Sequence, residues 1–340
     1  MPPEGLRSNK AAPVMRYRHR CIPDPIALGE PMKAARIHSY GPPEVISLEE
    51  ISIPEPGDGE VVVQVKAAGV GPWDALIRSG RSVLPQPLPL TLGSDLSGVI
   101  RSLGPGVRGF NVGDEVFGVT NERFTGAYAE YAIARAGMIA HKPKTLNYTH
   151  AASVPVVAVT AWQMVFELAA VAPEQFVLIH GGAGNVGGYL LQLAKRAGAM
   201  VVTTAAAKDT SYVRRLGAYG VIDYRVKPFE EQVKDVDAVL DTVGSGTLEP
   251  SYGVLKRGGI LVSSAAQPSE EKAQQHGVRA RFFLVEVTTE RLKKIAELID
   301  AGELNTEVGE VLWLHEARQA HEMLEGAPHR RGKIVIKIAD

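Results

Sequence analysis

The sequence contains little of what several classes of protein require. Cysteine occurs once, at Cys21, so the chain cannot form an internal disulfide or a cysteine-rich zinc site. The 37 Lys and Arg residues balance 38 Asp and Glu residues, which gives no sign of a nucleic-acid or membrane-surface partner. No apolar run approaches the roughly 18 residues that a membrane-spanning helix needs. We therefore expect a cytoplasmic protein without nucleic-acid or membrane partners.

The 340 residues suffice for two domains with sizeable cores, but the first 31 do not read as part of either. Prolines interrupt residues 1–31, no apolar period is present, and Arg16, Arg18 and Arg20 form a small basic cluster. The missing apolar segment excludes a secretory signal, and Glu4 and the prolines argue against a transit peptide. We interpret this stretch as a flexible arm, or as sequence upstream of a true start at Met32.

From Met32 the pattern changes to short strands separated by Gly and Pro turns. Segments that alternate or run apolar, and so predict strands, are 32–37, 46–53, 60–68, 98–103, 112–119 and 127–134. Regular short strands with frequent turns favour a small β-barrel or an irregular sandwich. Around residues 149–170 the pattern becomes helical.

A glycine-rich stretch, VLIHGGAGNVGGYLL at 177–191, organises the second half of the chain. A buried strand is predicted at 176–179, and helical apolar spacing begins at Val186, so the G-x-G-x-x-G match at 182–187 joins a strand to a helix. In that context Gly182 permits the tight turn, Gly184 has no Cβ to hold off a diphosphate, and Gly187 lets the helix pack closely. The helix start then attracts the anion. An ordinary glycine-rich turn is the plain alternative, and the flanking strand and helix argue against it.

Strands and helices alternate after this loop. Strands are predicted at 200–204, 221–224, 237–240, 259–263, 281–287 and 333–338, and helices at 212–216, 289–301 and 315–324. This rhythm is typical of an α/β protein with a doubly wound parallel sheet, the Rossmann arrangement.

The acidic residue that binds the ribose hydroxyls of NAD is missing. It is expected about 20 residues after the glycines. The sequence there runs from Thr204 and Ala205 to Lys208, with no carboxylate among them. A carboxylate would repel a 2′-phosphate and a cation would attract it, so we predict NADPH rather than NADH. Lys208 alone could be a solvated loop lysine, and the missing acid is the stronger argument.

These motifs together resemble the medium-chain dehydrogenase/reductase superfamily, and within it the zinc-free quinone oxidoreductase branch that includes zeta-crystallin. The resemblance runs from Met32 to the C-terminus. It is carried by the glycine loop and by segments at 67–70, 72–74, 93–99, 104–107, 112–116, 160–162, 241–244 and 331–335. It implies a GroES-like β-rich catalytic domain at 32–158, a Rossmann domain at 159–288, a return to the catalytic domain at 289–340, and an active-site cleft between the domains.

Zinc is not expected. In zinc-dependent members a cysteine follows the A-x-G-V run and a His-Glu pair fills the later glycine motif. Here Gly71 stands at the cysteine position and Ser94-Asp95 replaces the pair, and the structural zinc loop is absent. Zinc needs about three or four good ligands, and Asp95 alone is not a site.

The resemblance also implies which residues bind the cofactor. Thr160 corresponds to a threonine near the nicotinamide ring, Tyr224 to a tyrosine beside the adenosine phosphate, and Lys333 to a residue near the cofactor in some relatives. Tyr224 and Lys333 could equally be surface packing. The remaining predicted cofactor residues are Gly182, Ala183, Gly184, Asn185, Val186, Gly187, Thr204, Ala205, Lys208, Thr242, Val243, Phe283, Leu284 and Val285, of which the last three are expected on a strand.

We hypothesise an enzyme that transfers hydride from NADPH to a quinone or an α,β-unsaturated carbonyl without zinc. An enolate product needs a hydrogen-bond donor and a proton. Trp73 and Asp74 are the candidate catalytic residues, Asn121, Tyr128 and Tyr131 are weaker candidates, and water is another source. Quinone reductases of this branch often carry an asparagine at the position of Gly71 and a tyrosine at that of Leu76, so two polar groups are lost here.

Two other functions stay open. An NADPH-binding sensor or structural protein with little turnover fits the same cofactor loop. A secondary-alcohol dehydrogenase requires bound zinc. The resemblance further implies a homodimer, with the edge strand at 259–263 or 281–287 pairing across a two-fold axis.

Overall fold

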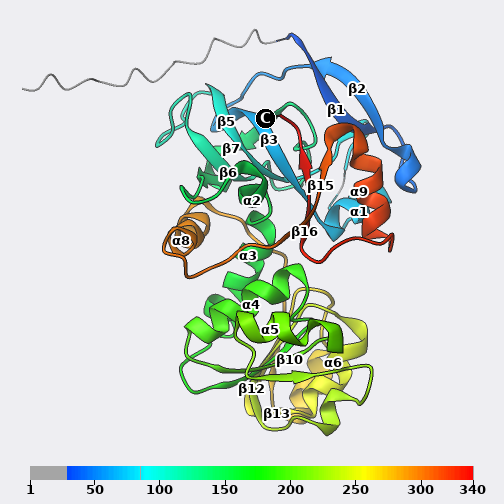
Figure 1. The fold of residues 1–340 in the computed structure, drawn as a ribbon, viewed down its shortest axis with the longest axis vertical. Helices are drawn as coiled ribbons and strands as arrows, with labels where there is room; N and C mark the ends of the chain where they lie inside the picture. The colour runs from blue at the N-terminus through cyan, green and yellow to red at the C-terminus, as the bar shows by residue number, and fades with distance from the viewer. Residues whose placement is uncertain (1–28, 85, 340) are drawn as a thin grey trace, which may run out of the picture.

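The computed structural model describes residues 29–84 and 86–339, and within them the chain forms three β-sheets and nine α-helices (Figure 1). The predicted N-terminal arm lies outside the described residues up to position 28. Its last residue, Pro31, already begins the first strand.

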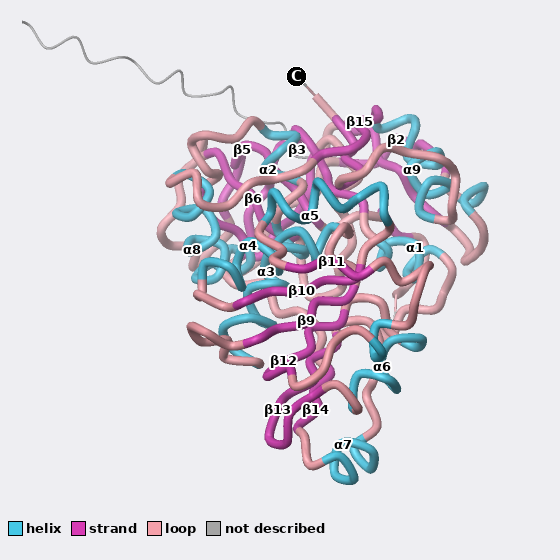
Figure 2. Tube along the Cα trace, turned by 60° about the horizontal axis from the view of Figure 1, so that its bottom comes forward, coloured by secondary structure: helices cyan, strands magenta, loops and turns pink. Residues whose placement is uncertain are grey.

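A parallel sheet of six strands within the described residues forms one domain. The strand order is β11-β10-β9-β12-β13-β14, and every neighbouring pair is parallel. Figure 2 shows these strands side by side. The bounds are β9 (Phe176–His180), β10 (Met200–Thr204), β11 (Gly220–Ile222), β12 (Val236–Asp241), β13 (Leu255–Ser263) and β14 (Arg279–Phe282). Because the chain winds outward in one direction from β9 and then in the other from β12, the predicted doubly wound sheet is confirmed.

Helices cover both faces of this sheet, as the strand pattern requires. Ile179 of β9 belongs to the core that contains α4 (Asn185–Arg196) and α5 (Thr210–Leu216). Its neighbour Leu178 belongs to the opposite core, with α6 (Ser245–Tyr252) and α7 (Glu270–His276). Successive side chains of a strand point to opposite faces, so both faces of β9 are apolar and buried.

The other two sheets form the β-rich domain that the sequence predicts. One has the order β15-β16-β3-β5-β6-β8 with β7 also paired to β3, and the other has the order β2-β1-β4. The bounds are β1 (Pro31–Ile37), β2 (Ser47–Ser52), β3 (Glu60–Val70), β4 (Leu90–Thr91), β5 (Asp95–Leu103), β6 (Glu115–Val119), β7 (Tyr131–Arg135), β8 (Ile139–His141), β15 (Val308–Trp313) and β16 (Lys333–Lys337).

Helices join the two domains and return the chain to the first one. α2 (Tyr148–Ala152) and α3 (Pro155–Trp162), which continues as a π-helix over Gln163–Leu168, lead from the β-rich domain to β9. After β14, α8 (Thr289–Asp300) packs against β8 and α3. β16 then pairs with β3, so the red C-terminal strands lie among the blue and cyan ones in Figure 1. α1 (Pro72–Arg78) and α9 (Ala317–Leu324) pack together at the side of this sheet.

The strand predicted at 281–287 is wrong beyond Phe282. β14 ends at Phe282, which is paired with Ser263, the last residue of β13. Because β13 stops there, residues 283–287 have no neighbouring strand to pair with. β14 is nevertheless at the edge of the sheet, as one of the two alternatives proposed, whereas 259–263 belongs to the interior strand β13.

Two predicted strands in the β-rich domain begin too early. Within 127–134 only the residues from Tyr131 form β7, because Ala129 first makes an isolated bridge with Ala34 before the chain crosses to pair with β3. Within 112–119, β6 begins at Glu115, since the preceding residues form a turn closed by Asn111 N–H and the Asp114 carboxylate.

Candidate active site

Most of the predicted cofactor residues lie at one edge of the parallel sheet, and Thr160 in α3 and Lys333 in β16 are the exceptions. Each group follows the carboxyl end of a strand: the glycine loop follows β9, residues 205–208 follow β10, Tyr224 follows β11, Thr242 and Val243 follow β12, and residues 283–285 follow β14. The carboxyl ends of parallel strands meet at a common edge, and the strand order reverses between β9 and β12. Ligands of doubly wound proteins bind at such a point.

The glycine loop has the close packing that its sequence predicts. A Cβ atom on Gly187 would lie 2.1 Å from the carbonyl oxygen of Gly181, and one on Gly182 would lie 2.2 Å from Thr203 Oγ1. Gly184 differs, since its φ of −79° and ψ of 171° suit any residue and its Cβ would meet only Gly181 O, at 3.2 Å. Gly184 is exposed at the start of α4, where free N–H groups favour an anion.

A buried polar cluster of His180, Thr204 and Thr242 fixes the glycine loop at the ends of the strands that precede it. Thr204 Oγ1 accepts the Gly181 N–H at 3.1 Å and contacts His180 Nδ1 at 3.3 Å, and Thr242 Oγ1 donates to the His180 carbonyl at 2.8 Å. Burial lowers the pKa of His180 to about 4, so the ring is neutral near pH 7. The predicted cofactor residues Thr204 and Thr242 thus fix the loop, and no motif in the sequence singles out His180.

The turn after β10 carries the residues predicted to select the cofactor. Ala205 is buried and Lys208 is exposed. The Asp223 carboxylate accepts the Ala207 N–H at 3.1 Å and therefore faces this turn from the next strand. Tyr224 is 55% exposed and has the Arg225 guanidinium 5.6 Å from its ring centre.

At the other end of the edge, apolar side chains are open to solvent. Val243 is 55% exposed and Leu284 is 59% exposed, whereas Phe283 and Val285 pack partly against the core. Thr160 lies within α3, buried, and its hydroxyl donates to its own helix at Val156 O, 2.7 Å away. The exposed apolar groups offer a surface on which flat rings can pack.

A lysine and an indole lie beside Gly71, Ser94 and Asp95, the positions at which the resemblance implies zinc ligands in zinc-dependent members. Lys333 Nζ lies 3.1 Å from Asp95 Oδ2 and 4.2 Å from the Trp73 ring centre, and both charged residues are buried. A Cβ on Gly71 would lie 2.2 Å from the Trp73 ring. Trp73 Nε1 in turn donates to Ser94 Oγ at 3.0 Å. Burial raises the pKa of Asp95, and the Lys333 ammonium opposes that shift.

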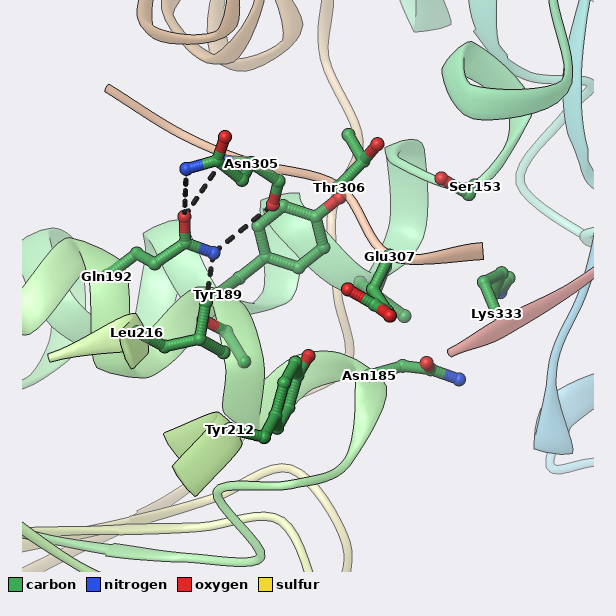
Figure 3. Close-up of a pocket in the computed structure, with 12 residues that line it drawn as sticks. Ser153, Asn185, Tyr189, Gln192, Tyr212, Leu216, Asn305, Thr306, Glu307 and Lys333 are labelled. Carbon is green, nitrogen blue, oxygen red and sulfur yellow. Dashed lines mark hydrogen bonds between the residues drawn. The ribbon is translucent and has the colours of Figure 1, made fainter. Parts of the chain in front are cut away.

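A pocket between the domains brings two predicted cofactor residues together. It is lined by Asn185 and Tyr189 of α4, Tyr212 of α5, and Glu307 and Lys333 of the β-rich domain. Figure 3 shows Asn185, a residue of the glycine loop, and Lys333 at the same end of this pocket. In the described part of the chain, no three His, Cys, Asp or Glu side chains are grouped as they would be around a metal ion.

Asp74, the second candidate catalytic residue, is fully buried at the start of α1. Its Oδ2 accepts the Gly71 N–H at 2.8 Å and the Tyr128 hydroxyl at 3.1 Å, and Oδ1 has no hydrogen-bond partner among the described residues. Burial raises its pKa from 3.8 to about 7, although the Gly71 N–H opposes the shift. The carboxyl can therefore hold a proton near neutral pH.

Replacing Asp74 with asparagine should remove a pH dependence of stability. The folded protein keeps a proton on Asp74 that the unfolded chain releases between about pH 4 and pH 7. The free energy of unfolding therefore falls as pH rises through this window, by about 2–4 kcal/mol. We expect the free energy of unfolding of Asp74→Asn, measured with urea, to equal that of the wild type near pH 4 and to be larger than that of the wild type at pH 8.

The matched control for that experiment is Asp114→Asn. Asp114 also accepts an N–H three residues earlier at 2.8 Å, but at the surface. The free energy of unfolding of Asp114→Asn should follow that of the wild type at every pH. If the free energy of unfolding of Asp74→Asn also ran parallel to that of the wild type across this pH range, the prediction would be contradicted.

Comparison with known proteins decides the family. Residues 57–144 match the alcohol dehydrogenase GroES-like domain, and residues 216–336 match the zinc-binding dehydrogenase domain. The quinone oxidoreductase of Sus scrofa is 30% identical over 323 residues, which cover 90% of this chain and 97% of that protein. The chain belongs to the medium-chain dehydrogenase/reductase family. The predicted resemblance is thereby confirmed, including its quinone oxidoreductase relatives.

Solved structures of the medium-chain dehydrogenase/reductase family have the same fold. The quinone oxidoreductase from Coxiella burnetii superposes with a TM-score of 0.84 at 35% identity, covering 91% of this chain and all of the other. The Escherichia coli quinone oxidoreductase complexed with NADPH superposes with a TM-score of 0.82 at 27% identity, covering 90% and 99%. A medium-chain dehydrogenase/reductase is an oxidoreductase that uses NAD or NADP, so the coarser part of the predicted function holds here.

Within residues 29–84 and 86–339, none of the helices of this medium-chain dehydrogenase/reductase is long and apolar enough to cross a membrane.

Proposed function

We propose that this chain is an NADPH-dependent oxidoreductase that transfers hydride to a quinone or an α,β-unsaturated carbonyl without zinc. The glycine loop is the observation that supports the proposal most. Gly184 is exposed and leaves space at the start of α4, and Gly182 and Gly187 pack too closely on their neighbours to carry a side chain. NADPH supplies the hydride when bound. We place its diphosphate over the glycine loop and its rings against the exposed apolar side chains at the carboxyl edge of the sheet.

The zinc-free part of the proposal is supported by the cluster of Lys333, Asp95 and Trp73. Zinc-dependent chemistry needs at least three ligands around an open position. Here the ammonium of Lys333 already neutralises Asp95, and a second cation at that place would be repelled. The Trp73 ring occupies the space that a side chain at position 71 would need.

Trp73 and Asp74 are the residues we propose for handling the proton that an enolate product requires. Asp74 can hold a proton near pH 7 and accepts hydrogen bonds from the Tyr128 hydroxyl and the Gly71 N–H, and Trp73 borders Lys333. Of the weaker candidates, Tyr128 donates to Asp74 and Asn121 donates to the Thr125 carbonyl. Water is the remaining source, and a quinone needs no dedicated acid.

A non-catalytic NADPH sensor is the second candidate. It is favoured by one observation, namely that the Trp73 indole N–H, the Tyr128 hydroxyl and the Asn121 amide all already donate within the protein. Leu76, at a position where relatives often carry a tyrosine, is 42% exposed and offers no hydrogen bond.

One experiment separates the two candidates. The full chain is titrated with NADPH, and the absorbance of the reduced nicotinamide is then followed with a panel of quinones and enones. We expect tight binding and decay with at least one acceptor, with no loss of rate after dialysis against a zinc chelator. Tight binding without decay on any acceptor would support the sensor, and stoichiometric zinc in elemental analysis would overturn the zinc-free assignment.

We also propose that the protein is cytoplasmic and forms a homodimer. The exposed position of β14 at the sheet edge suits pairing with a second copy across a two-fold axis. Sedimentation of the full chain tests the dimer.

A further inference from the structure

The chain crosses between the domains twice, and a buried glutamine fastens the two crossings together. The first crossing is α3 with the π-helix that continues it, and the second is the segment 283–288 between β14 and α8. The side-chain oxygen of Gln163, the first residue of the π-helix, accepts the Glu286 N–H at 3.0 Å. Gln163 is only 7% exposed, so water does not compete for this hydrogen bond. Short π-helical turns of this kind are frequent at functional sites.

Arg291, in the first turn of α8, grips both crossings from the other side. Its Nε and Nη2 donate to the two carboxylate oxygens of Glu167 in the π-helix, at 3.0 and 2.7 Å. Its Nη1 donates to the Glu286 carbonyl at 2.6 Å and to the Glu286 carboxylate at 3.0 Å. A guanidinium that binds a carboxylate through two parallel bonds has a fixed orientation. Gln163 and Arg291 therefore hold the N–H and the carbonyl of the same residue, Glu286.

The segment that is held in this way lies toward the nicotinamide end of the proposed cofactor site. The diphosphate is placed after β9 and the phosphorylated ribose after β10, so the nicotinamide must extend in the other direction, toward β12 and β14. Thr160, which is also predicted at this ring, precedes Gln163 by one helical turn. Because β13 ends at Ser263, the backbone ladder of the sheet does not reach residues 283–287. Their position therefore depends on the side chains that grip Glu286.

We propose that Gln163 and Arg291 are positioning residues for the nicotinamide ring, which they place by fixing the segment 283–286 against the helix that carries Thr160. The inference rests on the proposed function. The two side chains act through the backbone of this segment and not by touching the cofactor. Hydride transfer requires the reacting atoms to lie about 3–3.5 Å apart, so a small shift of the segment slows the transfer. The diphosphate and the phosphorylated ribose, held after β9 and β10, do not depend on the segment.

The test measures dissociation constants of the full chain for two ligands, NADPH and ADP-ribose 2′-phosphate, which is the same molecule without the nicotinamide ring. For Gln163→Leu and for Arg291→Met we expect NADPH to bind roughly 5–20-fold more weakly. ADP-ribose 2′-phosphate should bind within about twofold of its wild-type affinity. The rate of hydride transfer in a single turnover, with saturating NADPH and an acceptor that the wild type reduces, should fall by about tenfold or more.

Arg318→Met is the matched control. Arg318 also joins two glutamates, Glu44 and Glu322, but it lies in α9 of the β-rich domain and its side chain is 51% exposed. This substitution removes the same kind of ion pairs away from the segment 283–286. It should change neither dissociation constant nor the rate of hydride transfer.

The possible outcomes separate this inference from the proposed function. Equal weakening of both ligands would make Gln163 and Arg291 a general link between the domains and would overturn the inference, as would unchanged binding of NADPH. Wild-type protein that binds neither ligand would overturn the proposed function and the inference with it. If the wild type binds NADPH but reduces no acceptor, only the enzyme proposal fails, and the paired dissociation constants still decide. If Gln163→Leu does not fold, Arg291→Met decides alone, because its side chain is partly exposed.

Discussion

Gly184→Ala is expected to weaken NADPH binding by about 100-fold, or roughly 2.7 kcal/mol, while the protein stays folded. The backbone at Gly184 is extended, so alanine fits it without strain, and its Cβ meets only Gly181 O at 3.2 Å. Gly184 is the cap residue of α4, where alanine is less favourable than glycine, so a small cost of about 1 kcal/mol in stability is expected. The large effect arises because the methyl group projects into the space proposed for the diphosphate.

Gly187→Ala should behave differently, which makes the pair informative. Its Cβ would lie 2.1 Å from Gly181 O and 2.8 Å from Gly182 Cα, and neither backbone atom can move without displacing α4. We expect this variant to lose about 1–3 kcal/mol of stability as well as binding. The measurement is NADPH fluorescence titration beside thermal melting.

Gly137→Ala is the control for both glycine variants, because a Cβ there meets no atom within 4 Å and Gly137 lies in a surface turn. Gly137→Ala should change neither the NADPH affinity nor the melting temperature. If Gly184→Ala bound NADPH within about threefold of the wild type, the diphosphate would not lie over this loop.

Lys333→Met is the second substitution for which a large effect is expected, about 3–5 kcal/mol lost from the free energy of unfolding at pH 8. The ammonium lies 3.1 Å from Asp95 Oδ2 in a buried ion pair, and its removal leaves the carboxylate without a counterion. Burial already raises the pKa of Asp95, and loss of Lys333 raises it further. The folded variant then holds a proton that the unfolded chain releases, so its stability deficit should grow as pH rises.

A surface ion pair of the same chemistry provides the control. Lys256 lies 3.0 Å from Asp237, and the two side chains are 47% and 26% exposed. Lys256→Met should cost less than about 1 kcal/mol, because water screens and solvates both charges. Adding Asp95→Asn to Lys333→Met should restore much of the lost stability, since the neutral amide needs no counterion. Equal losses for Lys333→Met and Lys256→Met in urea unfolding would show that burial of the first pair carries no such cost.

Much of the fold follows from the sequence because its signals are local. The β-branched run before Gly182, the glycine spacing and the helical period after Val186 all lie within residues 176–197. The doubly wound sheet follows from the alternation of strands and helices that continues after them. The errors occurred where a strand depends on its neighbour. Residues 283–287 have the composition of a strand, yet they form none because β13 ends at Ser263 and offers no partner.

The sequence by itself determined the parallel sheet, the glycine loop and the missing carboxylate at Ala205, since each depends on residues close together along the chain. Only the tertiary structure decided which charges meet. It placed Lys333 against Asp95, Tyr128 against Asp74 and Arg331 against Asp209, a pair 122 positions apart. No pattern along the chain encodes these contacts, and those of Lys333 and Arg331 form only because β16 returns to pair with β3. The burial that raises the pKa of Asp74 to about 7 is likewise a property of the assembled layers rather than of its neighbours in sequence.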